Sequence, residues 1–360
     1  YRYLTDNQLL EKITRPNSMK KKRPSLKDIA EVLNVSTTTV SFVLNGKGKE
    51  KKISDELIAK VEAYLKEINY KPNLVARSLR TGSTRILVFM VEDISNHFFS
   101  KVGRLIEDIS YKNDYRVLFC STENDLKRTQ DLIQVFHERQ VDGFIIVPPP
   151  GIQEDIENLI ESEMPVILFD RKIPEIDCDY VIINNFEGAK NSTEHLIDSG
   201  FKNIAFITID LDQVQMHDRE AGYIAAMNEA GLTPNILKLP YNTSTVGSSR
   251  EAMKEFINNS KDLDAIFFAT NYLSQSGLKG IHQIDTQLID KLGIVSFDDS
   301  GFFEMYSPTI SAFAQPVEDM AENLMRIMFQ KLKNKENAKP EQLVLEGTLV
   351  KRESSKAKVV

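Results

Sequence analysis

The chain has 360 residues, a formal net charge of −7 and 41% hydrophobic residues. This length is enough for two or three domains, and the composition is ordinary for a soluble globular protein. No apolar run reaches the ~18 residues that a membrane span needs, and the first residues lack the basic start and apolar stretch of a signal peptide, so we expect a cytoplasmic protein with no membrane partner.

The charge is unevenly distributed along the chain. Residues 20–80 contain 14 Lys and Arg but only 7 Asp and Glu, whereas the chain as a whole is acidic. A small basic segment on a large acidic body predicts that this segment meets an anion such as nucleic acid. A solvated lysine-rich surface is the alternative that charge alone leaves open. Residues 1–18 precede Met19, and we treat them as an extension outside the fold.

Residues 23–70 are predicted to form a small helical domain with a helix-turn-helix. The S-x-x-D pattern at 25–28 is typical of a helix start. Asn34 stands where the chain must turn sharply, a place where Asn tolerates the left-handed conformation. Ser36 is a suitable cap for a second helix, and Ser54 for a third.

The second of these helices presents short polar side chains. Such side chains let a helix backbone approach base edges, and the Thr methyl group matches the thymine methyl. Thr is a mediocre helix former, so three in a row favour a DNA-reading helix over a hairpin with merely exposed threonines. The lysine-rich loop at 45–52 is predicted to contact phosphates. The predicted DNA contacts are Ser36, Thr37, Thr38, Ser41, Phe42 and Asn45.

Residues 71–83 are predicted to link this domain to the rest of the chain. The sequence "NLVARSLR" is compatible with a helix. It is shorter than the ~12 residues that an isolated helix needs, so we expect it to fold only when something stabilises it.

The body, residues 84–352, alternates apolar segments with helical ones. Continuous apolar strands between helices predict a doubly wound parallel sheet covered on both faces, and the length favours two similar lobes. The predicted strands are residues 85–93, 115–122, 142–149, 165–170, 179–185, 203–208, 264–270 and 292–299.

Ligands of open parallel sheets bind at the carboxyl ends of the strands, where several polar and aromatic residues fall. Carboxylates and guanidiniums can take the hydroxyls of a polyhydroxylated ring, while aromatic rings cover its apolar face. Packing aromatics, strand-end caps and a surface ion pair of Arg171 are the structural alternatives. The predicted effector-binding residues are Phe98, Phe99, Asp170, Arg171, Arg219, Thr270 and Asp298.

No catalytic or metal-binding set is recognisable. Cys120 and Cys178 are far apart and form no CxxC pattern, and the five histidines are scattered. The chain has no H-E-x-x-H, G-x-S-x-G or phosphate-loop motif. We therefore expect no enzymatic activity, no metal and no cofactor.

From about Ser25 to about Val350 the chain resembles the LacI/GalR family of bacterial transcription regulators. The resemblance rests on "LKDIAEVLNVSTTTVSFVLN", "INYKPNLVARSLRTGST" and "FDD". It implies a helix-turn-helix head and a body of the type I periplasmic-binding-protein fold, crossed three times by the chain. The implied lobes are 84–184 with 314–342, and 185–313 with 343–352.

In that family the linker is a hinge helix, and two such helices pair in the minor groove, where a leucine wedges between base pairs. By motif position the wedge is Leu79, for which a core leucine between domains is the alternative. The residues around the wedge are Asn73, Ala76 and Arg77.

The resemblance also implies a function. It describes a homodimeric regulator, most simply a repressor, that binds a palindromic operator in double-stranded DNA under the control of a carbohydrate-like effector. The seven residues above fall at its effector-contact positions, with Arg219 and Asp298 fixed by "REAGY" and "FDD". Phe42 replaces a common Arg, and Thr270 and Asn271 replace a common Asn and Asp, so operator and ligand both differ from familiar ones.

Several alternatives remain at this stage. In the nearest alternative, the chain is a regulator whose ligand is a phosphorylated sugar, a nucleobase or a partner protein. A sugar-binding receptor or an enzyme without a role on DNA is the more distant reading. The tail "KRESSKAKVV" has no leucine heptad, so we expect no C-terminal tetramer helix.

Overall fold

The chain divides into two compact units, residues 1–77 and 78–360. The predicted linker, 71–83, spans this division. The computed structural model describes residues 24–70, 78, 81–241, 246–333 and 339–356.

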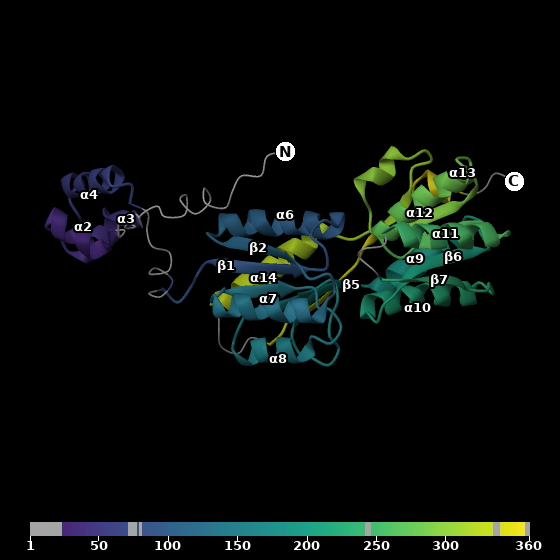
Figure 1. The fold of residues 1–360 in the computed structure, drawn as a ribbon, viewed down its shortest axis with the longest axis horizontal. Helices are drawn as coiled ribbons and strands as arrows, with labels where there is room; N and C mark the ends of the chain where they lie inside the picture. Colours follow the sequence, from purple (N-terminus) through teal and green to yellow (C-terminus); the bar gives the residue numbers. More distant parts are fainter. Residues whose placement is uncertain (1–23, 71–77, 79–80, 242–245, 334–338, 357–360) are drawn as a thin grey trace, which may run out of the picture. The chain divides into compact units, whose positions relative to one another are not determined.

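The first unit is a small helical domain with its own apolar core. Ile29, Val40 and Val61 come from three different helices and are almost completely buried against one another. Burial of such side chains is the main favourable term in folding a domain of this size. The helices are α2 (Leu26–Leu33), α3 (Thr37–Leu44) and α4 (Asp55–Glu67) (Figure 1).

The starts and ends of these helices follow the predicted signals. The Ser25 hydroxyl accepts a hydrogen bond from the Asp28 amide at 3.2 Å, and the Asp28 carboxylate accepts one from the Ser25 amide at 2.7 Å, which completes a capping box. Asn34 follows α2 with φ of 54°, the left-handed conformation expected for the turn. Ser36 and Ser54 cap the next two helices through their side chains.

The second unit contains two six-stranded sheets. The first, in spatial order, consists of β11 (Gln342–Leu345), β5 (Asp179–Ile183), β4 (Val166–Phe169), β3 (Gly143–Ile146), β1 (Ile86–Val91) and β2 (Arg116–Ser121). The second consists of β12 (Thr348–Val350), β10 (Ser311–Ala314), β9 (Gly293–Phe297), β8 (Ala265–Phe268), β6 (Ile204–Asp210) and β7 (Asn235–Pro240). Neighbouring strands are parallel except for β10 with β12. The predicted α/β class is therefore confirmed.

Helices cover both sheets, which explains why the central strands are buried along their whole length. The first sheet carries α6 (His97–Lys112), α7 (Leu126–Glu138), α8 (Gln153–Glu161) and α14 (Val317–Lys333) (Figure 1). The second carries α9 (Asn185–Asp198), α10 (Val214–Glu229), α11 (Val246–Asn259) and α12 (Asn271–Ile284), with the short α13 (Leu288–Lys291) after them. We call each sheet with its helices the first and the second lobe.

All eight predicted strands are present, but four others were not predicted. They are β7, β10, β11 and β12. β7 contains Lys238 and Pro240 and is half exposed at a sheet edge, and β11 alternates exposed and half-buried residues. Edge strands like these lack the continuous apolar run on which the predictions depended.

The chain crosses between the lobes three times. The third crossing was predicted between residues 342 and 343, but β11 pairs with β5 from Gln342 to Leu345. The crossing therefore lies between β11 and β12, at Glu346 and Gly347. A Cβ atom at Gly347 would lie 2.4 Å from the Phe313 ring, so only glycine fits this passage.

One carboxylate holds the segment that enters the first sheet. Asp142 accepts hydrogen bonds from the Thr84 amide at 2.7 Å, from the Thr84 hydroxyl at 2.8 Å and from the Arg85 amide at 3.2 Å, and it also accepts one from the Ser83 hydroxyl. Arg85 has a φ of 60°, and its guanidinium lies 4.9 Å from the centre of the Tyr115 ring. The residues that follow the linker are thus fixed to the sheet.

Candidate functional site

The head presents the predicted polar run of α3. Thr37 and Thr38 are exposed, while Ser41 and Phe42 are half-buried beside them. The Asn45 amide nitrogen donates to the Ser41 carbonyl at 2.7 Å and so helps to end the helix. The two exposed threonines are the side chains of this group best placed to reach a base edge.

Phe42 packs against the lysine-rich loop. The ammonium of Lys51 lies 5.7 Å from the centre of its ring and 3.1 Å from Glu50, while Lys49 lies 3.7 Å from Asp55. All these charged groups are largely exposed, so their pairing is weak and the lysines remain available to an anion. The predicted linker contacts Asn73, Ala76, Arg77 and Leu79 lie outside the described residues.

In the body, four charged side chains that were predicted as effector contacts lie together at the carboxyl ends of the strands. Asp170, Arg171, Arg219 and Asp298 each expose 7% or less of their surface. Asp170 interacts electrostatically with all three others. Chain segments far apart in sequence therefore meet here, as the position rule for parallel sheets predicts. We call these four residues the charged cluster.

Arg219 is held rigidly by the second lobe. Its Nε donates to Asn185 Oδ1 at 2.8 Å, its Nη1 donates to the Ala269 carbonyl at 2.7 Å, and its guanidinium lies 3.6 Å from the centre of the Phe297 ring. Burial lowers the pKa of Arg219, while Asp298 and Asp170 act in the opposite direction. A fixed, desolvated guanidinium is suited to selective hydrogen bonding.

The two aspartates of the charged cluster have an unusual backbone. Asp170 follows β4 with φ of 67°, and Asp298 follows β9 with φ of 69°. Left-handed residues other than glycine are uncommon and gather at functional sites. Gln315 Nε2 also donates to Asp298 Oδ1 at 2.5 Å, which orients that carboxylate.

The pKa of Asp170 is raised. Burial is the largest cause, and it outweighs the attraction of Arg171 and Arg219. Asp298 and Glu92 raise the pKa further by repulsion between like charges. The ionised carboxylate is thus held at an energetic cost, which is a common feature of binding and catalytic sites.

The remaining predicted effector residues are placed differently. Phe98 and Phe99 are buried in the first lobe, where the centre of the Phe98 ring lies 5.7 Å from that of Phe169. Thr270 caps α12 through its hydroxyl. Arg171 is not a surface ion-pair partner, because it is buried and its Nη2 lies 3.0 Å from Glu92 Oε2.

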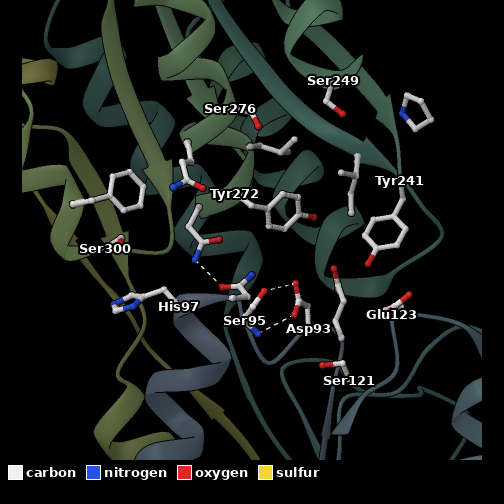
Figure 2. A pocket seen from close by; sticks show the side chains of 18 of the residues that line it. Asp93, Ser95, His97, Ser121, Glu123, Tyr241, Ser249, Tyr272, Ser276 and Ser300 are labelled. Carbon is white, nitrogen blue, oxygen red and sulfur yellow. Dashed lines mark hydrogen bonds between the residues drawn. The ribbon is translucent and has the colours of Figure 1, made fainter. Parts of the chain in front are cut away.

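A cavity of about 970 Å³ lies beside the charged cluster, between the two lobes. None of the seven predicted effector residues lines it, although their neighbours His97 and Asn271 do. Figure 2 shows Tyr241 and Tyr272 of the second lobe across from Asp93 and Ser95 of the first. We call this cavity the cleft pocket.

Three glutamines near the ends of strands were not predicted. Gln213 Nε2, Gln215 Oε1 and Gln315 Oε1 are buried, and none has a hydrogen-bond partner within the described part of the chain. Buried polar atoms without partners are rare, so these amides are candidates for ligand contacts. The sequence contains one signal for two of them, because Gln213 and Gln215 lie within the five residues before "DREAGY".

The described residues contain neither a candidate membrane span nor a candidate metal site. No helix there is both long and apolar enough to cross a bilayer. Those residues also contain no group of three or more His, Cys, Asp or Glu side chains that could hold a metal ion.

Comparison with known proteins agrees with this architecture. Residues 25–73 match the model of bacterial regulatory proteins of the lacI family, and residues 193–355 match a periplasmic binding protein-like domain. The HTH-type transcriptional regulator RegA of Clostridium saccharobutylicum is 31% identical over 92% of this chain and 99% of its own. The ribose operon repressor of Haemophilus influenzae is 30% identical over 92% and 98%. A lac repressor dimer bound to operator superimposes with a TM-score of 0.80, at 21% identity, over 93% of this chain and 100% of its own.

A helix-turn-helix head joined to a two-lobed, ligand-binding-type body defines the class: a DNA-binding transcription regulator. The chain belongs to the lacI family of bacterial regulatory proteins. The predicted family, fold class and role in transcription are therefore confirmed.

Proposed function

We propose that this regulator is a homodimeric repressor whose affinity for a palindromic operator is changed by a small carbohydrate-like effector at the charged cluster. The observation that carries the proposal is the pair of left-handed aspartates, Asp170 and Asp298, beside the fixed guanidinium of Arg219. The proposed effector-binding residues are Phe98, Phe99, Asp170, Arg171, Arg219, Thr270 and Asp298, and we propose no enzymatic activity.

The chemistry of the charged cluster supports a hydroxylated ligand. Carboxylates accept hydrogen bonds from hydroxyl groups, and a guanidinium donates them to hydroxyl and ring oxygens. A polyol offers both kinds of group at close spacing. A ligand that contacts Asp170 in one lobe and Asp298 in the other binds the two lobe arrangements differently, which is what changes the affinity for DNA.

The ligands named for similar proteins differ. In this chain, the charges around the cleft pocket favour an uncharged ligand. Similar proteins include the ribose operon repressor, purine repressors named PurR, a CelR–cellobiose complex and a Cra regulator bound to fructose 1-phosphate. Glu92, Asp93 and Glu123 line the cleft pocket, and its Arg128 already lies 2.6 Å from Glu123. Three carboxylates against one arginine leave the lining with a net negative charge, which disfavours a phosphate, so an uncharged ligand fits better.

For the DNA side we propose direct contacts from α3 and minor-groove contacts from the linker. The proposed residues are Ser36, Thr37, Thr38, Ser41, Phe42, Asn45, Asn73, Ala76, Arg77 and Leu79. The proposed division of the chain is a head at 23–70, a linker at 71–83 and a body at 84–352.

Selection of random duplex DNA by the purified full-length chain tests the proposal as a whole. We expect a palindrome, and we expect a pool of sugars to change the recovery of that palindrome. Recovery of no specific sequence, with or without sugars, would refute the proposal. A palindrome whose recovery no sugar changes would refute the effector class.

The lysine-rich loop should contribute mainly to salt-dependent binding. In a variant with Lys49, Lys51 and Lys52 replaced by Gln, the slope of log affinity against log salt should fall by about 0.9 for each lost phosphate contact. Fluorescence anisotropy at salt concentrations from about 50 to 200 mM resolves such a change in slope.

The matched control changes the same number of lysines in the body, and its slope should equal that of the unmodified protein. An unchanged slope in the loop variant would show that these lysines do not contact phosphates. The control lysines, all exposed, are Lys112, Lys127 and Lys333.

The Asp142 carboxylate, which lies in the body, should contribute to operator affinity. Asp142→Ala removes the acceptor that holds residues 83–85, so ordering the adjoining linker on DNA becomes more costly. We expect about tenfold weaker operator binding, or ~1.4 kcal/mol, with effector affinity unchanged. Asp142→Asn keeps one acceptor oxygen and should lie between the two. Equal operator affinity of all three proteins would contradict the anchoring role.

A further inference from the structure

The cleft pocket carries an inference about the size and charge of the ligand. We propose that the effector is an uncharged oligosaccharide of two or more rings, with one ring at the charged cluster and the next in the cleft pocket. This inference rests on the proposed function, because it extends the same site.

Two side chains that line the cleft pocket also interact with the charged cluster. Glu92 lines the pocket, and its carboxylate also lies 3.0 Å from Arg171 Nη2. Tyr272 lines the pocket and interacts electrostatically with both Arg171 and Arg219. A ligand bound at the charged cluster therefore has the pocket as its direct extension.

The volume exceeds what a single sugar ring needs. Ligand pockets for drug-sized molecules have about 300–1,000 Å³, and this pocket, at about 970 Å³, lies near the upper limit although it contains none of the charged cluster. One ring at the cluster would leave the whole pocket filled with solvent. A second and third ring would remove that solvent from the apolar part of the lining.

The lining offers the two surfaces that a neutral sugar chain requires. Three half-buried aromatic rings, Tyr241, Tyr272 and Phe302, provide faces on which apolar sugar faces can pack. Hydroxyl and amide groups surround them, among them Ser95 and Ser276 on opposite sides of the pocket (Figure 2). Such groups donate and accept hydrogen bonds without carrying charge.

The charge of the lining selects against anionic sugars. Glu92, Asp93 and Glu123 face the pocket, and Arg128 is engaged by Glu123. Repulsion by Glu92 also contributes to the raised pKa values of Tyr241 and Tyr272, after burial as the main cause. The Tyr272 hydroxyl therefore stays protonated and can donate to a sugar oxygen, whereas the Tyr241 hydroxyl donates to Glu92 and contributes its ring face.

The pocket also spans the contact between the lobes. Asn271 Nδ2 of the second lobe donates to Asn96 Oδ1 of the first at 3.0 Å, and both residues line the pocket. An oligosaccharide in the pocket would contact both lobes over a longer distance than one ring does. It therefore has more binding free energy with which to distinguish two lobe arrangements.

Isothermal titration of the full-length chain tests this inference. The probes are glucose, maltose and maltotriose, the matching series glucose, cellobiose and cellotriose, xylose with xylobiose, and glucose 6-phosphate. We expect affinity in one series to rise at least tenfold from one ring to two, and glucose 6-phosphate to bind more weakly than any member of that series. Equal or tighter binding of the single ring or of the phosphate overturns the inference, as does binding of none of these sugars.

A substitution in the pocket locates the second ring. Tyr241→Ser removes an aromatic face and should weaken the oligosaccharide by about 3–10-fold, more than it weakens the single ring. Tyr241→Phe keeps the ring and should retain most of the affinity. If Tyr241→Ser weakens both ligands equally, the second ring does not lie in the pocket.

Parallel titration of Asp298→Asn distinguishes a failure of this inference from a failure of the proposed function. A single ring that depends on Asp298, with no gain from further rings, refutes the inference and leaves the proposed function intact. An oligosaccharide whose affinity is unaffected by Asp298→Asn refutes the proposed function, because the charged cluster would then hold no ring.

Discussion

Asp298→Asn is expected to abolish the response to effector while leaving operator binding without effector unchanged. Asparagine tolerates the left-handed backbone that this position requires, and its Oδ1 can still accept from Gln315. The negative charge is lost, and the second acceptor oxygen is replaced by an amide nitrogen that only donates. Hydrogen bonds to a charged group contribute about 1.5–3 kcal/mol each, so losing the charge at two ligand hydroxyls should weaken the effector by about 100-fold.

Two measurements on the same protein check this expectation. Titration calorimetry gives the effector affinity, and fluorescence anisotropy with labelled operator gives the effector concentration that changes DNA binding. Asp212→Asn is the matched control, because the Asp212 side chain is 97% exposed and, among the described residues, lies 2.9 Å from the likewise exposed His217. Full effector affinity in the Asp298 variant would exclude this carboxylate from the site.

The sequence predicted the head almost completely because its signals are local. The capping pattern at 25–28, the turn at Asn34 and the caps Ser36 and Ser54 each depend on residues within one helical turn. In the body, the eight long apolar strands were predicted for the same reason. The short edge strand β11 was not, because its stability comes from pairing with β5, far away in the sequence.

The candidate site was likewise predicted only in part. Position at the carboxyl ends of parallel strands selected Asp170 and Asp298, and the "REAGY" motif selected Arg219 near the start of a helix. The cleft pocket could not be predicted from the sequence, because Tyr241 and Tyr272 line it only where the two lobes meet. Phe98, proposed as an effector contact from its place after a strand, also stacks its ring on Phe169, a contact that the sequence did not identify. Residue type and order do not determine which way such a side chain turns.

Asp170→Asn should stabilise the ligand-free protein while it removes the effector response. The pKa of Asp170 in the folded protein lies above its ordinary value, mainly because of burial. The folded state therefore binds a proton more tightly than the unfolded state does, and stability falls as pH rises between the two pKa values. The cost of the buried charge grows as the pH rises above the unfolded pKa, and asparagine, which also tolerates φ of 67°, avoids it.

The pH dependence distinguishes this mechanism from a general packing effect. Differential scanning calorimetry at neutral pH should show a higher melting temperature for Asp170→Asn, by about 2–4 °C for each kcal/mol removed. In acid, below the unfolded pKa of an aspartate, Asp170 is protonated in both states, so the difference should disappear. A variant less stable at neutral pH would mean that attraction to Arg171 and Arg219 outweighs burial. A gain that persists in acid would mean that the carboxylate charge is not its cause. If the gain follows the predicted pH course and effector affinity is lost, then the charge is kept for ligand binding at the expense of stability.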